Sequence, residues 1–275
     1  MTVARKRFGQ HFLEPAWIER VIAAAQPRPD DRTIEIGPGR GALTLPLAAR
    51  GASVTAVELD RDLVTWLAPR VPPNVRIVSG DFLSLDSAAL FSDGPSDARY
   101  RVVGNLPYNV SSPILFRLID IYRQTHRFVD ATLMLQREVA ERLSAAPGSR
   151  ESGVLSNTVQ LDADVETRLT LPPGAFRPAP KVWSAVIRLA FRPPVVDLAD
   201  ERRPLFDTLL RSIFAQRRKT LANALKPLAS SRGLDSRALV AQAGIDGSRR
   251  PESLHLMELV KLADALACPG NPSVV

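Results

Sequence analysis

Short apolar runs alternate with amphipathic stretches along the first 195 residues of this chain. Each apolar run ends in a polar turn, and stretches with helical spacing, such as 43–49 and 113–122, lie between the runs. This alternation is typical of βαβ units, in which helices cover both faces of a parallel sheet. Five buried strands are therefore predicted at residues 33–37, 53–60, 75–81, 100–108 and 131–139.

Two more β-rich runs follow, at residues 165–171 and 185–191, with a long loop between them. Strands joined in this way can form an antiparallel pair that closes the sheet at one edge. With the five earlier strands, they predict a mainly parallel, seven-stranded sheet of the Rossmann-like α/β class.

Beyond the segment Arg192-Pro193-Pro194, the pattern changes to helices. Apolar side chains recur at helical spacing through residues 205–214. The sequence therefore predicts an α/β domain over residues 1–195 and a small all-helical domain over residues 196–275. Two more helices are expected at residues 235–243 and 251–267, the second with a proline in its first turn.

Composition excludes several classes of protein and favours a polyanionic partner. The single cysteine excludes an intrachain disulfide framework, and the three histidines lie far apart, so no metal site is expected. No apolar run reaches the roughly 18 residues that cross a bilayer, and the basic start lacks the apolar core of a secretory signal. We therefore expect a cytoplasmic protein without a membrane partner. The net charge of +7 suits binding to nucleic acid.

A glycine-rich turn follows the first predicted strand directly. Segment 35–41 has the spacing G-x-G-x-G, with Gly37 and Gly39 placed for a tight turn and a close ligand approach. It differs from the G-x-G-x-x-G of a dinucleotide fold. About twenty residues later, Glu58 ends the second strand, where a carboxylate can accept hydrogen bonds from ribose hydroxyls.

The third predicted strand ends in Gly80-Asp81-Phe82. The Asp81 carboxylate can accept a hydrogen bond from an adenine amino group, and the Phe82 ring can pack on the base. A glycine turn, a ribose acid and an adenine acid at successive strand ends favour S-adenosylmethionine over a nicotinamide dinucleotide. For Asp81 alone, capping of a helix N-terminus would be an equally good interpretation.

The fourth predicted strand ends in Asn105-Leu106-Pro107-Tyr108. The adenine N6 amine is a poor nucleophile because its lone pair is delocalised into the ring. Acceptors at the Asn105 side chain and the Leu106 carbonyl would favour a tetrahedral nitrogen, and Pro107 fixes the direction of that carbonyl. Tyr108 offers a face on which a flipped base can stack. These residues predict methylation of adenine N6 without a general base.

With these motifs, the chain resembles the KsgA/RsmA family of ribosomal RNA adenine dimethyltransferases over nearly its whole length. The resemblance implies a class I methyltransferase domain with a helical domain that docks on rRNA. It also implies dimethylation of two adjacent adenines in a 3′-terminal hairpin of 16S rRNA, by a protein expected to act as a monomer on the small ribosomal subunit. The motifs that carry it are Gly9-Gln10-His11-Phe12-Leu13, residues 105–111, Phe176-Arg177-Pro178-Ala179-Pro180-Lys181-Val182-Trp183-Ser184-Ala185-Val186 and residues 214–221.

The resemblance also implies roles for individual residues. His11 and Leu13 fall on cofactor-contact positions of the family, as do Gly37, Glu58, Asp81 and Asn105. Phe176 is expected to stack on the target adenine opposite Tyr108, with core packing as its alternative. Three adjacent cations on one predicted helix, Arg217, Arg218 and Lys219, are expected to meet rRNA phosphates. The cluster Arg5, Lys6 and Arg7 fits an RNA-binding arm and a disordered start equally well.

Two alternatives stay open from the sequence. An Erm-type methyltransferase, which modifies a large-subunit (23S) rRNA adenine, shares the fold and an Asn-x-Pro-aromatic motif. Leu106, the extension Asn109-Val110-Ser111 and the basic run 217–220 favour the KsgA/RsmA side. A non-catalytic ribosome-assembly or nucleic-acid-binding factor is the other alternative, and the intact motif from Asn105 to Tyr108 argues against it.

Overall fold

The computed structural model describes residues 11–268, apart from residues 93, 147, 150, 195, 197 and 199. The chain divides into two compact units. One, called here the α/β unit, contains the chain up to Ala140 together with Ala163–Arg192. The other, the helical unit, contains Glu141–Asp162 together with the chain from Pro193 onward.

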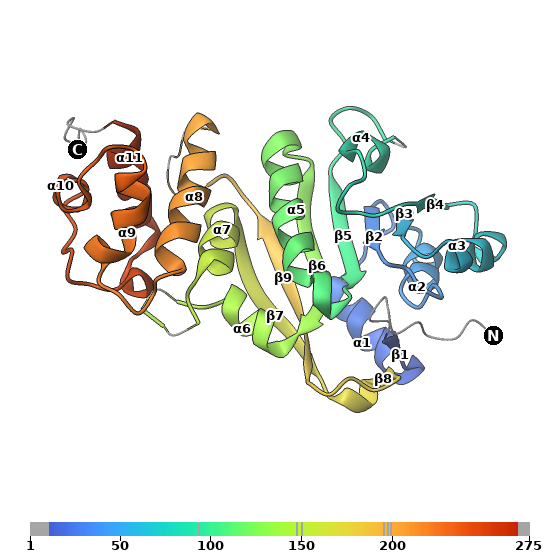
Figure 1. Cartoon of the computed structure of the whole chain (residues 1–275). Coiled ribbons are helices and arrows are strands. Elements are labelled where there is room, and N and C mark those ends of the chain that lie inside the picture. Colours follow the sequence, from blue (N-terminus) through green and yellow to red (C-terminus); the bar gives the residue numbers. More distant parts are fainter. Residues whose placement is uncertain are drawn as a thin grey trace. The chain divides into compact units, whose positions relative to one another are not determined.

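The α/β unit is built on a seven-stranded sheet (Figure 1). Its strands are β2 (Arg32–Ile36), β3 (Ser53–Glu58), β4 (Val75–Ser79), β5 (Tyr100–Asn105), β6 (Phe128–Gln136), β7 (Ala163–Leu171) and β9 (Ser184–Phe191). They lie in the order β4-β3-β2-β5-β6-β9-β7. Pairing is parallel from β4 to β6, and β9 runs antiparallel to both β6 and β7. The predicted mainly parallel sheet with its closing antiparallel pair is confirmed.

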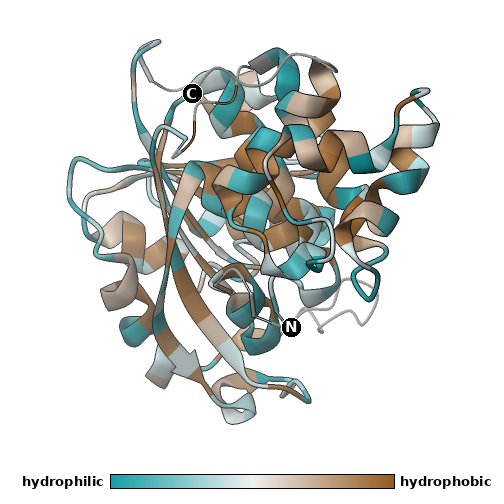
Figure 2. Cartoon of the chain, turned by 90° about the vertical axis from the view of Figure 1, so that its left-hand side faces the viewer, coloured by the Kyte–Doolittle hydropathy of each residue, from teal (hydrophilic) through white to brown (hydrophobic). Residues whose placement is uncertain are grey.

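Helices cover both faces of this sheet. Val102 and Val103 are consecutive residues of β5, so their side chains point to opposite faces, and both are buried. Val103 belongs to a cluster with residues of α1 (Pro15–Ala25) and α2 (Thr44–Ala49), whereas α5 (Ser111–Thr125) packs against β6. Figure 2 shows the matching colour pattern, because many helices carry brown, hydrophobic residues along one side and teal, hydrophilic ones along the other.

Two short strands, β1 (Phe12–Leu13) and β8 (Phe176–Arg177), form a separate antiparallel pair that the sequence did not predict. Leu13 pairs with Phe176, and Phe12 pairs with Arg177. This pairing joins the start of the described chain to the long loop before β9. Short helices complete the unit: α3 (Arg61–Leu67) and α4 (Ser87–Leu90), with α6 (Arg137–Leu143) at its boundary.

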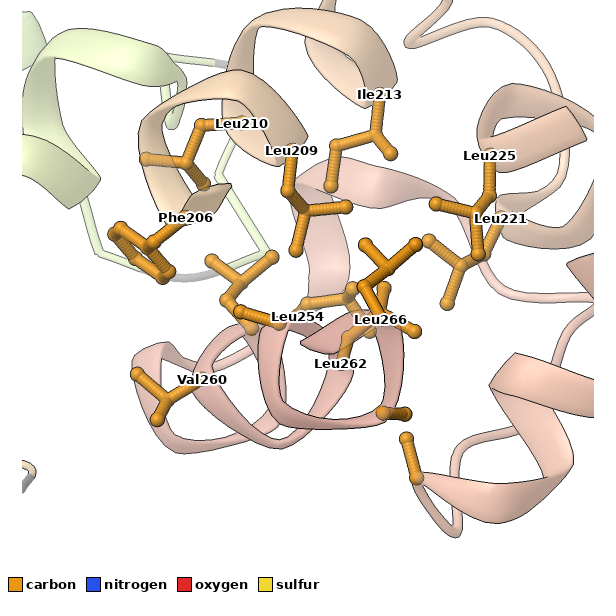
Figure 3. Close-up of a cluster of buried hydrophobic side chains, with 14 of the residues drawn as sticks. Phe206, Leu209, Leu210, Ile213, Leu221, Leu225, Leu254, Val260, Leu262 and Leu266 are labelled. Carbon is orange, nitrogen blue, oxygen red and sulfur yellow. The ribbon is translucent and has the colours of Figure 1, made fainter. Parts of the chain in front are cut away.

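The helical unit surrounds its own hydrophobic core. Its helices are α7 (Val154–Asp162), α8 (Arg203–Phe214), α9 (Leu221–Ser230), α10 (Ser236–Gln242) and α11 (Leu256–Ala267). Figure 3 shows Phe206, Leu209 and Ile213 of α8 with Leu262 and Leu266 of α11 in one buried cluster. The helical spacing predicted for 205–214 places these α8 side chains on one face.

Two boundaries differ from the sequence prediction. The predicted α/β domain contained all of residues 1–195, but Glu141–Asp162 belongs to the helical unit. The reason is that Leu161 of α7 is fully buried in the cluster of the helical unit, with Val154 packed against it. The helix predicted from residue 251 begins instead at Leu256. A 3₁₀ turn covers Pro251–Ser253, and His255 then caps α11 in a capping box with Glu258.

Candidate active site

A cavity of about 250 Å³ lies in the α/β unit at the carboxyl ends of β2, β3, β4 and β5. Loops at this edge of a parallel sheet converge, because the strands all end in the same direction. Residues that the sequence analysis predicted for the cofactor and for catalysis line it together: His11, Leu13, Gly37, Gly39, Glu58, Asp81, Phe82, Asn105, Leu106, Pro107 and Tyr108.

The glycine turn after β2 has the backbone that the spacing predicted. Gly37 and Gly39 have φ values of +71° and +58°, in the left-handed region that side chains disfavour. A Cβ at Gly39 would also come within 3.4 Å of the Phe12 ring. The Gly39 N–H donates a hydrogen bond of 3.0 Å to Oε2 of Glu58, so the turn is tied to the end of β3.

Glu58 accepts a second backbone hydrogen bond, because the Asp60 N–H lies 2.9 Å from its Oε1. Each carboxylate oxygen has more than one lone pair and can still accept from a ligand hydroxyl. Burial raises the pKa of the Glu58 carboxyl above its usual range, although both N–H groups act in the opposite direction. The two backbone hydrogen bonds hold the Glu58 carboxylate in place at the cavity wall.

Glu35 lines the cavity too, although no role was predicted for it. It is buried in β2, and burial, with the nearby Glu58 carboxylate adding to it, raises its pKa to about 7. Its Oε2 is buried without a hydrogen-bond partner. Such an oxygen fits a ligand that brings its own donor, as the methionine ammonium of S-adenosylmethionine does. With the glycine turn, this atom makes the cavity a fit for that cofactor.

Asp81 and Phe82 lie at the far end of the same edge, after β4. The Asp81 Oδ1 accepts from the Leu83 N–H at 3.0 Å, and its carbonyl accepts from the Leu85 N–H at 2.8 Å. Asp81 thus stabilises its own turn, but it caps no helix, because the next helix, α4, begins at Ser87 and has Asp86 as its N-cap. Phe82 is buried and still lines the cavity.

The end of β5 presents two hydrogen-bond acceptors next to each other in the chain. Nδ2 of Asn105 donates to the His11 carbonyl at 2.9 Å, which fixes the orientation of the amide. The Leu106 N–H donates to the Met134 carbonyl at 3.0 Å. Within the described part of the chain, neither Oδ1 of Asn105 nor the carbonyl oxygen of Leu106 has a hydrogen-bond partner. Pro107, with φ −60° and ψ 129°, continues the extended backbone.

Tyr108 is held by two contacts. Its hydroxyl lies 2.6 Å from the Ser184 Oγ, and burial raises the pKa of the phenol. The His11 ring stacks on the Tyr108 ring, with centroids 5.4 Å apart and planes 25° apart. His11 is itself anchored, since its Nδ1 lies 2.7 Å from the Pro178 carbonyl oxygen. One face of Tyr108 is therefore covered by His11. Sequence reasoning gave Ser184 no role, although it lies in a recognised motif.

Phe176 is not brought to the cavity. Its ring is fully buried in a hydrophobic cluster that includes Leu13 and Leu171, because β8 pairs with β1 and turns this side chain inward. In this arrangement the ring packs in the core, which was the alternative interpretation, and it has no exposed face for the predicted stacking on a base.

The basic run 217–219 lies in the turn between α8 and α9, so the prediction that it is helical was wrong. Helix α8 ends at Phe214, and Thr220 is the N-cap of α9. The Arg217 Nε lies 3.1 Å from an oxygen of Glu252, whereas Arg218 and Lys219 are exposed. Arg5, Lys6 and Arg7 lie outside the described residues.

The described residues form neither a metal cluster nor a helix that could span a membrane. No cluster of three or more histidine, cysteine, aspartate or glutamate side chains there could hold a metal ion. No helix in that part of the chain is long and apolar enough to span a membrane.

Comparison with known proteins gives a consistent result. The family model for ribosomal RNA adenine dimethylase matches residues 1–263. "Ribosomal RNA small subunit methyltransferase A" of Xylella fastidiosa is 43% identical over 268 residues, 96% of each chain. The protein of that name from Anaeromyxobacter sp. is 44% identical over 273 residues, covering 96% of this chain and 93% of the relative.

Two solved structures are similar over nearly the whole chain. A dimethyladenosine transferase from Plasmodium falciparum has a TM-score of 0.71 and 24% identity, over 92% of this chain and 96% of that one. The 23S rRNA methyltransferase ErmE has a TM-score of 0.65 and 25% identity, over 94% of this chain and 100% of that one.

Proposed function

Because this chain belongs to the ribosomal RNA adenine dimethylase family, we propose that it dimethylates N6 of two adjacent adenines in a 3′-terminal hairpin of small-subunit (16S) rRNA, with S-adenosylmethionine as methyl donor. The relatives at 43% and 44% identity carry a small-subunit name, and this supports the small subunit as substrate. ErmE, the large-subunit enzyme, is only 25% identical, so the Erm-type reaction is the weaker candidate.

The observation that carries this proposal is the pair of unpartnered acceptors at Asn105 Oδ1 and Leu106 O. An adenine amino group has two N–H bonds, one for each acceptor. Hydrogen bonding to both draws the nitrogen toward a tetrahedral geometry and exposes its lone pair. The hydrogen bond from Asn105 Nδ2 to the His11 carbonyl keeps Oδ1 directed as an acceptor, so this arrangement exists before substrate binds.

The cofactor would be held by groups from three strand ends. Glu58 would accept from the ribose hydroxyls, Glu35 from the ammonium group, and Asp81 from the adenine amino group. The glycine turn lets the cofactor approach the backbone closely. When bound, S-adenosylmethionine supplies an electrophilic methyl group on its sulfonium. The residues of this chain provide placement and electrostatics.

Tyr108 would support the flipped target base by stacking. The face now covered by the His11 ring becomes available only when that ring moves, so either His11 shifts or the base uses the other face. No general base is assigned, since the proton of the methylated amine can pass to water. The helical unit, with Arg218 and Lys219 exposed, would dock on folded rRNA. We expect a cytoplasmic protein that is monomeric. Light scattering after gel filtration tests the oligomeric state.

The test uses labelled S-adenosylmethionine with two substrates: small ribosomal subunits that lack the adenine dimethylation, and protein-free large-subunit rRNA. Products are digested to nucleosides and identified by mass spectrometry. Dimethyladenosine in the small subunits alone supports the proposal, whereas label in the large-subunit RNA favours the Erm-type reaction.

The control is Asn105→Ala, checked for folding by circular dichroism. An enzyme should lose methyl transfer by orders of magnitude with this variant. If the wild-type protein transfers label to neither substrate, the alternative of a non-catalytic assembly or binding factor is favoured instead.

A further inference from the structure

An exposed loop, residues 177–183, borders the catalytic edge of the α/β unit. Apart from Pro180, its residues are exposed. The loop is tied to the catalytic motif on both sides. The Pro178 carbonyl contacts the His11 ring that stacks on Tyr108, and Ser184, directly after the loop, contacts the Tyr108 hydroxyl. Its position relative to the cavity is therefore fixed by contacts and not by chain connectivity alone.

This loop exposes an aromatic ring. The Trp183 side chain is 46% exposed, beside Val182 at 42%. The other two tryptophans each have an arginine guanidinium over the ring, Arg20 at 4.6 Å from Trp17 and Arg70 at 4.5 Å from Trp66. Within the described part of the chain, Trp183 has neither a ring partner nor a cation over it. A large flat surface is thus left open to a ligand.

The backbone at this ring is held by a hydrogen bond to the end of β6. The Trp183 carbonyl accepts a hydrogen bond of 3.0 Å from the Arg137 N–H, just beyond the pairing of Gln136 with Ser184 at the end of β6. Trp183 precedes Ser184, whose Oγ is 2.6 Å from the Tyr108 hydroxyl. Its Cα therefore lies within roughly 9 Å of that hydroxyl, since consecutive Cα atoms are about 3.8 Å apart. Because Trp183 continues the pairing with β6, its side chain points away from the face on which Ser184 contacts Tyr108. From that side its ring can meet the nucleotide that flanks one stacked on Tyr108.

The charge beside the ring suits RNA. Lys181 is exposed and has no carboxylate partner within the described residues. An aromatic face with a nearby cation is the combination that binds unpaired nucleotides, because the ring stacks on the base and the cation meets the phosphate. We propose that Trp183 and Lys181 form a second nucleotide-binding site, which stacks an unpaired nucleotide adjacent to the target adenine. This inference rests on the proposed function and extends it to the flanking RNA.

The test compares Trp183→Phe, which keeps an aromatic face, with Trp183→Leu, which keeps apolar area without one. Steady-state methylation of undermethylated small subunits gives KM for the subunit, KM for S-adenosylmethionine and kcat. Trp183→Leu should raise the subunit KM about 10-fold, a typical loss for one stacked base, whereas Trp183→Phe should stay within about 3-fold. KM for S-adenosylmethionine should not change in either variant.

Val129→Ala is the matched control, because Val129 is also an exposed apolar residue but lies near the opposite end of β6. It should behave as wild type. An unchanged subunit KM in Trp183→Leu, or an equal defect in Trp183→Phe, overturns the inference. Since Trp183 is exposed, both variants should keep the wild-type Tm. A lowered Tm in Trp183→Leu alone would show that the ring packs against the protein, and this result would also overturn the inference.

A binding measurement separates RNA from protein partners. The probe is the protein-free 3′-terminal hairpin of 16S rRNA, titrated while tryptophan fluorescence is recorded. Quenching in the wild type that is absent in Trp183→Leu supports a base on the ring. A subunit KM defect without any hairpin effect would indicate a ribosomal protein and overturn the RNA assignment. Failure of the wild type to methylate subunits would refute the proposed function instead, so the two failures are distinguishable.

Discussion

The hydroxyl of Tyr108 lies 2.6 Å from the hydroxyl of Ser184, and this hydrogen bond links the turn that follows β5 to the first residue of β9. Ser184 is fully buried and Tyr108 is half-buried, which limits the access of water to the bond. The two residues lie 76 positions apart in the chain. The orientation of the Tyr108 ring therefore depends on a residue of β9 and not only on the loop that carries Tyr108.

Removing Ser184 should lower activity through Tyr108. In Ser184→Ala the half-buried Tyr108 hydroxyl loses this partner, and kcat for methyl transfer should fall about 3- to 10-fold, the usual net value of one hydrogen bond. Tyr108→Phe should cost a similar amount, and the double variant should cost no more than either single one. Additive losses would show that Ser184 acts independently of Tyr108. Steady-state kinetics on small subunits gives the four rates.

Glu58→Gln should weaken cofactor binding more than it slows chemistry. An amide has one acceptor oxygen, so it cannot accept from both the Gly39 and the Asp60 N–H groups as the carboxylate does. The glycine turn should loosen, and the Kd for S-adenosylmethionine should rise at least 10-fold by titration calorimetry. The rate at saturating cofactor should change much less. An unchanged Kd would remove Glu58 from the cofactor site.

Stability without ligand should fall as the pH rises through about 7. The pKa of Glu35 is raised from 4.5 to about 7 by burial, so the folded protein holds this proton over a range in which the unfolded chain has lost it. The contribution is fully present below pH 4.5 and is lost as the pH rises through the folded pKa. Glu35→Gln cannot ionise. The Tm of wild type minus that of Glu35→Gln should therefore decrease between pH 5 and 8, and parallel profiles would contradict this.

Gly104 should not tolerate a side chain. A Cβ there would lie 2.9 Å from the carbonyl oxygen of Ile36 and 3.2 Å from the Leu106 side chain, between two paired strands. Gly104→Ala should lose about 1–3 kcal/mol of stability and displace the adjacent Asn105, so activity should also fall. Gly153→Ala is the control, because its nearest contact would be an ordinary 3.9 Å from the carbonyl oxygen of Glu151. Equal Tm values for the two variants would contradict the prediction.

Arg218 and Lys219, in the basic turn after α8, should contribute more to RNA binding than Arg217 does. Arg217 is paired with Glu252, whereas Arg218 and Lys219 are exposed. Replacing both Arg218 and Lys219 by Gln should reduce the slope of log K against log salt for subunit binding by about 2, near one per phosphate contact. Arg217→Gln should change the slope less. An unchanged slope in the double variant would place the docking surface elsewhere in the helical unit.

Much of this protein is determined by its sequence through local rules. The apolar runs indicated the seven strands of the main sheet one after another along the chain, because buried strands are rich in apolar residues. The strand ends then placed Gly37, Glu58 and Asp81 around one cavity, since parallel strands end at the same edge. These relationships need only spacing along the chain, and they were predicted correctly.

Contacts between distant segments depend on how the folded elements pack, and they were not predicted. The tertiary structure turned Phe176 into the core through the β1–β8 pairing, joined Ser184 to Tyr108, and left Glu35 with a buried unpaired oxygen. It also moved the segment 141–162 into the helical unit. Each outcome depends on which surfaces meet when remote elements pack. Spacing along the chain fixes which face a side chain takes on its own element, but burial and hydrogen bonding are set by the neighbours that packing supplies.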